Sequence, residues 1–511
     1  MSHRIRNFVI IKTDQQRADT IAAQGHPHVI TPNLDRLARE GVSFVQSFAC
    51  GATCVASRAA FYTGMYAHNT GCYSFDRWSH NRTWVHELRE AGYHTAAIGK
   101  VHHSPGHDPM AFHDRIYAEN FPDMSDWADD YATYLKSGGQ ESGCRLLTAD
   151  GRWLEKQCSD AFPLPEEYHE DQFIGRMACR WIRDYAREQP FFLHIGFQGP
   201  HDPFDPPQRF LDLYAGREVP LPRPDHAGLD ARPPQYKRHM EAVLNDARWD
   251  SPPSHAGWAI DLRTAGAADL ARMRRHYYAL ITQIDEQVGR IMDGLAARGM
   301  LDETLVIFTS DHGENLGDHG LMYKWLMTDE AIRVPMIVRL PGPAGATDQR
   351  AGERDAALFS QIDVGPTILE AADLAIPDRF DGRSNLRRLL TGDPGQAPDA
   401  VFCEDNYLTM YRTLTRKYIH YAGQAHAEYF DLTNDPFEER NLAADSEYAQ
   451  EIEGLRAKLL DWLLVSRYHG SLPQAGLANG SRAIWPANHP EDPWVLHSGM
   501  KGNAGIRRKR R

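Results

Sequence analysis

Five short apolar segments, each bounded by Gly, Pro or polar residues, constrain the fold of this 511-residue chain most strongly. Such continuous runs are typical of strands that are buried on both faces of a parallel sheet. Between residues 268 and 297, apolar residues recur at spacings of three and four, which predicts one long amphipathic helix. A second helix is expected after Thr31, with Thr31 as its cap and Pro32 in its first turn. The alternation of strand-like apolar segments with helix-like segments predicts an α/β fold. The apolar segments cover residues 8–11, 95–98, 191–197, 304–309 and 335–338.

The chain divides into one large and one smaller unit. Two long stretches rich in Pro, Asp, Gly and aromatic residues interrupt the alternation, and loops of this length usually serve as lids or oligomer contacts. Near residue 376 the composition changes, and short strand-like segments with an amphipathic helix over 451–464 predict a smaller α+β unit. The strand-like segments are 400–404, 412–420 and 428–431. We predict a catalytic domain (1–375, with lid-like insertions at 104–165 and 203–265), a C-terminal α+β subdomain (376–470), and an extended arm with a basic tail (471–511).

Composition excludes several classes of protein. The net charge of −13 argues against general affinity for nucleic acid, which requires a basic surface. No stretch approaches the length of a membrane span, and the apolar run at 8–11 is too short for the core of a signal peptide. Seven scattered cysteines do not suggest a disulfide framework. We therefore expect a cytoplasmic protein that does not act on nucleic acid or in a membrane.

Polar residues collect just beyond the carboxyl ends of four apolar segments. In open α/β sheets, ligands bind at this edge. Singly, either aspartate could cap a helix and each histidine could be an ordinary loop residue. Together, carboxylates, imidazoles and an ammonium group at matching positions predict a metal-assisted site for an anion. The residues are Asp14, then Lys100, His102 and His103, then His201, then Asp311 and His312.

One further motif, Cys54-Val55-Ala56-Ser57-Arg58, opens a segment that reads as a helix. A five-residue pattern is weak evidence alone, and Cys54 could be a buried structural thiol. Cys50 and Cys54 could also form a redox or metal pair, although no second Cys/His pair with zinc spacing follows closely. The polar residues at the sheet edge favour a catalytic interpretation.

These residues together resemble the sulfatase branch of the alkaline-phosphatase-like superfamily, close to choline-sulfatase-like enzymes and phosphonate monoester hydrolases. Residues 54–58 match the C-x-[P/A]-x-R signal, in which the cysteine is oxidised to formylglycine. The resemblance implies a large mixed, mostly parallel sheet flanked by helices, with a smaller C-terminal α+β subdomain. The other matching segments are 31–37, 92–102, 310–319, Lys324 with 330–335, and 431–442.

The resemblance also implies roles for particular residues. One divalent metal, calcium or manganese rather than zinc, would be held by Asp14, Asp311, His312 and the modified Cys54. The formylglycine hydrate would attack the ester through one hydroxyl and expel the oxyanion on losing the proton of the other. The remaining residues would act on charge and protons. Arg58 would hold the diol, Lys100 and Lys324 would clamp the anion, His102 would take the diol proton, and His201 with Lys324 would stabilise or protonate the leaving oxygen.

The resemblance leaves the substrate open. A Lys100/His102 pair looks more like a sulfatase, because the phosphonate enzymes carry Tyr and Thr there. We therefore expect hydrolysis of a small sulfate monoester, with phosphonate monoester or phosphodiester hydrolysis and a catalytically silent binding protein as alternatives. Gln15 stands where many sulfatases have a second aspartate, and the segment 73–76 receives no role. A formylglycine-generating maturation enzyme and assembly into a dimer or tetramer are also expected.

Overall fold

A computed structural model describes residues 5–74, 76–78, 81–103, 108–119, 129–140, 158–223, 232–237, 262, 265–342, 350–394 and 397–466. Its main feature is an eight-stranded sheet in the order β5-β4-β6-β1-β7-β8-β2-β9. Strand β8 pairs antiparallel with both of its neighbours, and the other pairs are parallel. The strands are β1 (Asn7–Thr13), β2 (Val42–Phe44), β4 (His94–Gly99), β5 (Asp114–Ile116), β6 (Phe191–Gly196), β7 (Thr304–Ser310), β8 (Met336–Arg339) and β9 (Arg354–Asp355).

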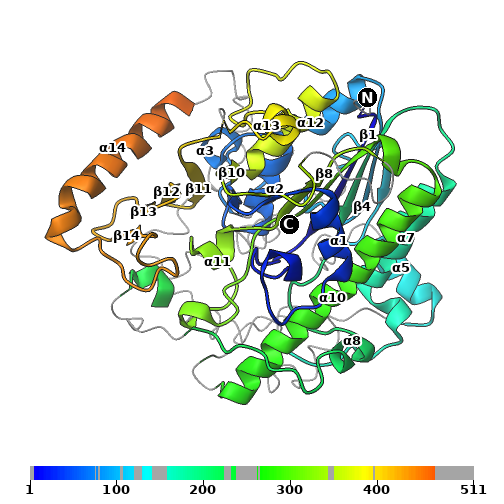
Figure 1. Cartoon of the computed structure of the whole chain (residues 1–511), viewed down its shortest axis with the longest axis horizontal. Coiled ribbons are helices and arrows are strands. Elements are labelled where there is room, and N and C mark those ends of the chain that lie inside the picture. Colours follow the sequence, from blue (N-terminus) through cyan, green and yellow to red (C-terminus); the bar gives the residue numbers. More distant parts are fainter. Residues whose placement is uncertain are drawn as a thin grey trace, which may run out of the picture.

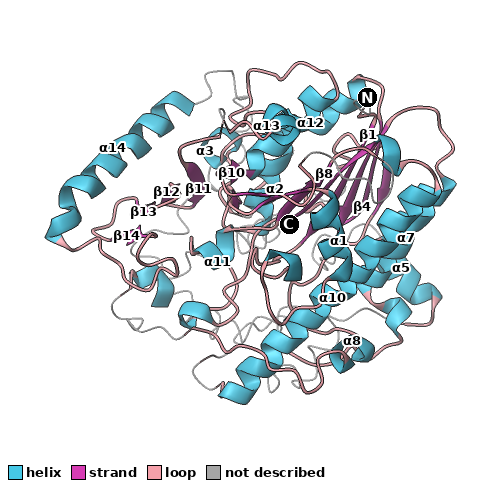
Figure 2. Cartoon of the chain, viewed as in Figure 1, coloured by secondary structure: helices cyan, strands magenta, loops and turns pink. Residues whose placement is uncertain are grey.

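Helices cover both faces of this sheet, as Figures 1 and 2 show. On one face, residues of α1 (Pro32–Glu40), α5 (Asp130–Ser137), α7 (Glu170–Asp184) and α10 (Ala267–Ala297) share one buried apolar cluster with Val9 and Ile11 of β1. On the other face, α2 (Cys54–Thr63), α4 (Trp84–Glu90) and α12 (Val364–Ala371) pack against Phe8 and Ile10. Alternate β1 residues thus face opposite layers, so the central strand is buried on both sides.

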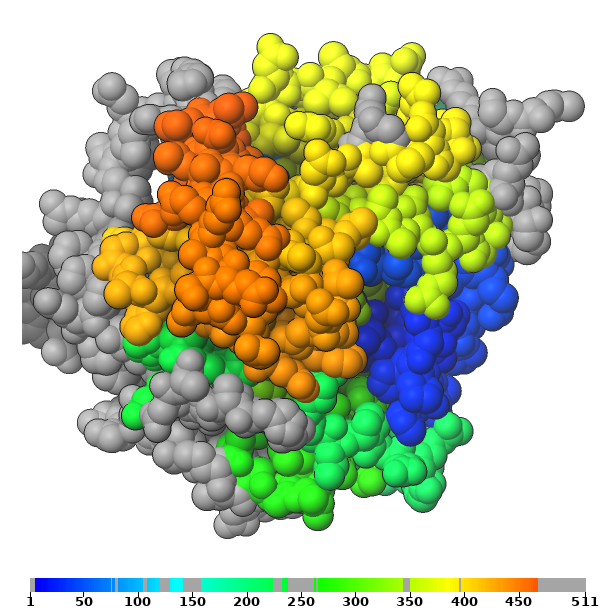
Figure 3. Space-filling model, turned by 60° about the vertical axis from the view of Figure 1, so that its left-hand side comes forward, coloured from blue at the N-terminus to red at the C-terminus, as the bar shows by residue number. Residues whose placement is uncertain are grey.

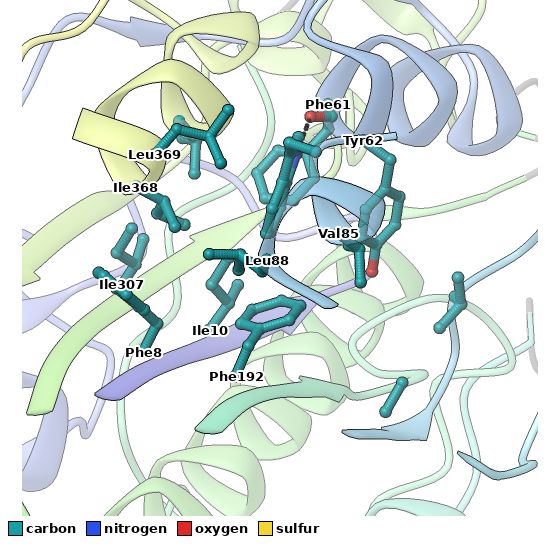
Figure 4. Packing of buried hydrophobic residues seen from close by; sticks show 14 of the residues in the cluster. Phe8, Ile10, Phe61, Tyr62, Val85, Leu88, Phe192, Ile307, Ile368 and Leu369 are labelled. Atoms are coloured by element: carbon teal, nitrogen blue, oxygen red, sulfur yellow. Dashed lines mark hydrogen bonds between the residues drawn. The ribbon is translucent and has the colours of Figure 1, made fainter. Parts of the chain in front are cut away.

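Figure 4 shows the second of these layers, where Phe61 and Tyr62 of α2 lie over the sheet. All ten residues of α2 are buried, and the helix contacts α4 and α12 as well as the sheet. The indole N–H of Trp84 donates to the carbonyl of Phe61 (2.8 Å), which satisfies a polar group inside this core. A helix held on all sides can keep its first turn fixed, and Cys54 lies in that turn.

In the large unit, the five predicted strands and both predicted helices are confirmed, with two corrections. The segment near 335–338 forms β8, which runs antiparallel to β7 rather than parallel. The cap of α1 comes from Asp285 of α10, which accepts from the backbone N–H groups of Asn33 and Leu34, because Thr31 makes no capping hydrogen bond with its side chain. Tertiary packing supplied the acceptor that a sequence window around Thr31 could not show.

The C-terminal unit is a four-stranded antiparallel sheet in the order β11-β12-β13-β14. Residues 412–420, predicted as one strand, contain the end of β12, a turn and most of β13. One face of this sheet packs on Phe48, Ala52 and Ile332 of the large unit, and the other carries α14 (Ala449–Ser466). Figure 3 shows the C-terminal unit, residues 401–466, in orange along one face of the molecule. The strands are β11 (Val401–Asp405), β12 (Leu408–Arg412), β13 (Arg416–Tyr421) and β14 (Ala427–Asp431).

Several short elements complete the described chain. The arm at 471–511 and parts of both insertions lie outside the described residues, and the domain boundaries stay a prediction. Among the residues that are described, no helix is long and apolar enough to cross a membrane. The short elements are β3 (Ser47–Phe48), β10 (Phe359–Ser360), α3 (Ala67–Thr70), α8 (Gln208–Asp212), α11 (Asp329–Ile332) and α13 (Leu386–Thr391).

Candidate active site

Four adjacent strands of the large sheet bring the predicted polar residues to one edge. The strands lie in the order β4-β6-β1-β7, and Lys100, Asp14 and Asp311 directly follow β4, β1 and β7. His201 lies in the loop after β6. Backbone hydrogen bonds join these strand ends, from Asp311 N–H to the Thr13 carbonyl (3.2 Å) and from Lys100 N–H to the Gly196 carbonyl (2.8 Å). The strand ends therefore hold the side chains at fixed separations.

The close approach of β4 to β6 depends on glycine. A Cβ atom on Gly196 would lie 2.0 Å from the Lys100 carbonyl oxygen, and one on Gly99 would lie 2.1 Å from the Gly196 carbonyl oxygen. Gly99 also has a φ of +83°, which L side chains rarely adopt. Lys100 can leave the strand at this point only because neither glycine carries a side chain.

Two buried carboxylates form the centre of the site. Asp14 Oδ2 accepts from Lys100 Nζ (2.7 Å) and from Arg58 (3.3 Å), and Asp311 Oδ2 accepts from Arg58 Nε (2.9 Å). Asp14, Arg58 and Asp311 are fully buried. Burial alone would raise the Asp14 pKa, but the nearby cations, Lys100 foremost, hold it well below its usual value. Asp14 is therefore an anion that this environment stabilises.

The same carboxylates and His312 could hold a metal ion. One ligand atom from each of Asp14, Asp311 and His312 lies within 4.8 Å of the others, and all three residues are buried. Among the described residues, Asp14 Oδ1 and His312 Nε2 are buried without a hydrogen-bond partner. Burial lowers the His312 pKa to about 4, which leaves its imidazole neutral and able to coordinate. An oxygen and a nitrogen that lie close together without hydrogen-bond partners are suitable ligand atoms for a divalent cation.

Cys54 is the first residue of α2, and the first turn of that helix packs on the site. Thr53 caps the helix by accepting from Ala56 N–H (3.4 Å), and Ser57 Oγ donates to the Asp311 carbonyl (2.5 Å). Burial raises the pKa of the Cys54 thiol, although Lys324 and Lys100 oppose that shift. A buried neutral thiol is a poor nucleophile. The unmodified cysteine is therefore badly suited to attack a substrate.

Lys324 and His201 meet beside Asp14 and act on its charge. The Lys324 ammonium donates to His201 Nε2 (2.8 Å) and to Gln15 Oε1 (2.7 Å). His201 Nδ1 lies 2.9 Å from the Asp202 carbonyl oxygen, so the Nδ1–H tautomer leaves Nε2 free to accept from the ammonium. Burial and the charge of Lys324 lower the His201 pKa well below its usual value. A neutral imidazole beside an ammonium group can share a proton with a leaving oxygen.

His102 lies on a constrained loop after β4. Its φ is +58°, and its backbone N–H donates to Glu119 Oε2 (2.9 Å), while Val101 N–H donates to Glu119 Oε1 (2.9 Å). Burial, then Lys100 and Arg58, lower the His102 pKa well below its usual value. This environment keeps the imidazole neutral, which is the form that can accept a proton, and the same burial and charges weaken it as a base.

The structure adds one residue that the sequence did not assign to the site. Gln15 has a φ of +68°, its N–H donates to Asp311 Oδ1 (3.0 Å), and its carbonyl accepts from the Tyr277 hydroxyl (2.6 Å). Its position directly after Asp14 was the available signal. No pair forms between Cys50 and Cys54, because Cys50 Sγ contacts Ser360 Oγ (2.9 Å) and both cysteines are free.

Comparison with known proteins identifies the family of this chain. The family model "Sulfatase" matches residues 6–374, and the C-terminal model of N-sulphoglucosamine sulphohydrolase matches residues 317–463. An arylsulfatase of Clostridium perfringens is 28% identical over 476 residues, which cover 89% of this chain and 93% of that protein. The multifunctional alkaline phosphatase superfamily protein PehA of Trinickia caryophylli is 28% identical over 503 residues, with 90% and 95% covered.

Solved structures give the same result for the fold. The phosphonate monoester hydrolase of Agrobacterium radiobacter superimposes with a TM-score of 0.72 at 26% identity, covering 90% of this chain and 96% of that one. Because a family model spans residues 6–374 and the fold matches over 90% of the chain, the chain belongs to the sulfatase family of sulfuric ester hydrolases.

Proposed function

We propose that this protein hydrolyses a small aryl or alkyl sulfate monoester, with Cys54 matured to formylglycine and one divalent metal in the site. The observation that carries the proposal is the buried cluster in which Lys100 and Arg58 flank Asp14, beside Asp311 and His312. This cluster lies against the first turn of the helix that begins with Cys54. Such a site can hold an anionic ester next to its nucleophile.

Asp14, Asp311 and His312, with residue 54, would hold the metal. When bound, a divalent cation acts as a Lewis acid on an ester oxygen and lowers the pKa of an attacking hydroxyl. Two carboxylates and one imidazole suit manganese, and calcium is the second candidate. Arg58 directs its guanidinium to both carboxylates and to the Lys100 carbonyl (3.1 Å), so it orders this donor set. Its contact with the modified side chain stays a prediction.

The remaining residues would manage charge and protons. Lys100 and Lys324 would stabilise the negative charge that builds on the oxygens of the transferred group. His102, buried and neutral, would take the proton from the second hydroxyl of the formylglycine hydrate, so that the covalent sulfo-enzyme collapses and releases sulfate. His201 and Lys324 share one hydrogen bond and would stabilise or protonate the leaving oxygen.

A second candidate is hydrolysis of phosphonate monoesters or phosphodiesters at the same residues. The similarity to the phosphonate monoester hydrolase of Agrobacterium radiobacter supports it. The Lys100/His102 pair favours sulfate, because it places two cationic or proton-accepting groups where the phosphonate enzymes carry Tyr and Thr. Rates measured in parallel on 4-nitrophenyl sulfate and on a phenylphosphonate ester will decide, and faster turnover of the phosphonate would reverse our order.

Mass spectrometry of the peptide that contains Cys54 tests the proposal directly. In a host that matures sulfatases, we expect conversion to formylglycine and turnover of the sulfate ester, with Cys54→Ala as the inactive control. An unmodified thiol without turnover would favour a silent binding protein on the same scaffold. We further propose that a formylglycine-generating enzyme matures the chain. The mature protein would work in the cytoplasm as a dimer or tetramer. Sedimentation of the purified protein checks the assembly.

A further inference from the structure

We propose that a surface groove between α7 and α10 binds a small organic anion that has an apolar body. The two helices lie side by side (Figure 1), and the groove between them has a volume of about 580 Å³. Pockets of about 300–1,000 Å³ usually take one small molecule. Four small or apolar residues and five arginines form most of its lining. They are Met177, Cys179, Gly294 and Ala297, and Arg176, Arg180, Arg183, Arg290 and Arg298.

The groove is separate from the candidate active site. Tyr277 of α10 donates to the Gln15 carbonyl beside Asp14, and Gly294 lies further along the same helix. With a rise of about 1.5 Å per residue, the two positions are about 25 Å apart. The residues that line the groove include none of the predicted catalytic or metal-binding residues. Binding here is therefore independent of the ester hydrolysis proposed above.

Three of the five arginines have carboxylate partners near the groove. Arg180 and Arg183 both contact Asp184, at 3.6 and 2.8 Å, and Arg290 contacts Glu286 at 2.6 Å. The three arginine side chains are 50–69% exposed. Ion pairs in such positions contribute little, because water competes for both partners. These guanidinium groups can therefore turn to a ligand at small cost.

The other two arginines form no ion pair among the described residues. Arg176 donates to the Glu167 carbonyl (2.8 Å), and Arg298 donates to the carbonyls of Arg183 and Tyr185 (2.7 Å each). A backbone carbonyl accepts a hydrogen bond without cancelling the charge of the donor. The groove therefore carries an excess of positive charge, although the whole chain has a net charge of −13.

Gly294 keeps the groove open at a point where helix packing does not require glycine. Glycine inside a helix is destabilising relative to alanine, so its presence needs a reason. Gly175 of α7 has one, because a Cβ there would lie 2.2 Å from Gln287 Oε1. A Cβ on Gly294 would instead approach Ile182 Cγ2 at 3.8 Å, an ordinary contact distance. Space for a ligand gives this glycine a reason that packing does not.

An organic anion fits these features better than a cation or a protein. Guanidinium groups bind carboxylate, sulfate and sulfonate groups through paired hydrogen bonds, whereas they repel a cation. The apolar part of the lining suits an aryl or short acyl body. A protein partner usually buries about 800 Å² on each side, which is far more surface than one groove of this volume offers.

Cys179 provides a probe within the groove itself. It is free, and among the described cysteines it alone is only partly buried. Burial raises the pKa of its thiol, so alkylation is slow enough to follow. A ligand that covers the apolar part of the lining would shield this thiol.

The test measures alkylation of Cys179 by iodoacetamide, with mass spectrometry of the peptide that contains it. The probes are 1-octanesulfonate and octanoate, which share a chain and differ in the anionic head. Octyltrimethylammonium carries the same chain with a positive charge, and inorganic sulfate carries negative charge without a chain. A sulfonate is not an ester and is not hydrolysed. Because the readout is specific to residue 179, binding of any probe at the active site does not disturb it.

We expect both octyl anions to slow alkylation at least about fivefold, with half of the effect near about 10⁻⁴ M. The octyl cation and inorganic sulfate should change the rate less than about twofold. The concentrations at which the sulfonate and the carboxylate act will show which head group the groove prefers.

Two variants test the two parts of the site. Gly294→Leu fills the groove, and the octyl anions should then change alkylation less than about twofold. The double variant Arg176→Gln/Arg298→Gln removes the two uncompensated charges and should raise the half-effect concentration by about tenfold or more. Arg456→Gln, at a 59% exposed arginine of α14, is the matched control and should behave as wild type. Melting temperature and turnover of the sulfate ester check that each variant is folded.

Shielding by the octyl cation equal to that by the anions would overturn the proposal, as would shielding that neither groove variant weakens. Failure of both anions to shield Cys179 in wild type would overturn it too. Sedimentation of wild type and Gly294→Leu covers the remaining occupant. A wild-type dimer that Gly294→Leu dissociates would assign the groove to a second copy of the chain instead of a small anion.

Discussion

Replacing Arg58 with methionine would test whether Asp14 and Asp311 form a metal site. Methionine fills much of the same volume but removes the guanidinium, which donates to both carboxylates and to the Lys100 carbonyl. All three charged side chains are 0% exposed, so the variant leaves buried carboxylates short of a partner. Breaking a buried ion pair in this way costs about 3–5 kcal/mol. That is a fifth or more of the roughly 5–15 kcal/mol by which proteins are stable.

The assay is urea unfolding in EDTA and in saturating manganese. In EDTA we expect the free energy of unfolding of Arg58→Met to lie below that of wild type by the whole of this cost, about 3–5 kcal/mol. A bound ion at 100 times its Kd stabilises by about 2.7 kcal/mol. The gain from manganese should be larger in Arg58→Met than in wild type, because the guanidinium no longer repels the ion.

Arg339→Met is the matched control for this experiment. Arg339 is 1% exposed, donates to Glu40 Oε2 (2.8 Å) and to backbone carbonyls, and lies on β8 away from the site. Its loss should cost a comparable amount, and manganese should change that cost no more than it changes wild type. If Arg58→Met gains no more from manganese than Arg339→Met does, the guanidinium does not oppose a metal at these two carboxylates and the reasoning is wrong; if neither variant nor wild type gains anything, the carboxylates do not bind the metal.

Three further predictions concern catalysis and the scaffold. Lys100→Ala and His102→Ala should each lower turnover of the sulfate ester by about 10² or more, since one loses a charge clamp and the other a proton acceptor; wild-type-like rates would show that the site is misplaced. Gly196→Ala should yield little folded protein, because its Cβ would lie 2.0 Å from the Lys100 carbonyl oxygen; normal expression and circular dichroism would contradict this. Asp285→Ala should lower the free energy of unfolding by about 1–2 kcal/mol through loss of the α1 cap while kcat stays unchanged, which urea unfolding and a turnover assay will check. A loss of turnover at equal stability would mean that Asp285 reaches the site.

The sequence by itself determined the elements that repeat a simple pattern. Buried strands must be apolar on both faces, so β1, β4, β6 and β7 appeared as continuous runs, and the 31-residue helix α10 appeared as an apolar stripe. Polar residues placed directly after such strands had to meet at one edge, which located Asp14, Lys100 and Asp311 before any contact was known. The role of Cys54 as the residue converted to formylglycine was predicted from the motif at residues 54–58.

Only the tertiary structure decided which of these residues serve one another. Strand direction in β8, the cap that Asp285 gives to α1, and the placement of Gln15 between Lys324 and Glu314 all depend on partners more than 25 residues away along the chain. A local pattern records what a segment needs, such as burial or a cap. It does not record which distant side chain meets that need, because that choice depends on how the packed layers bring separate segments together.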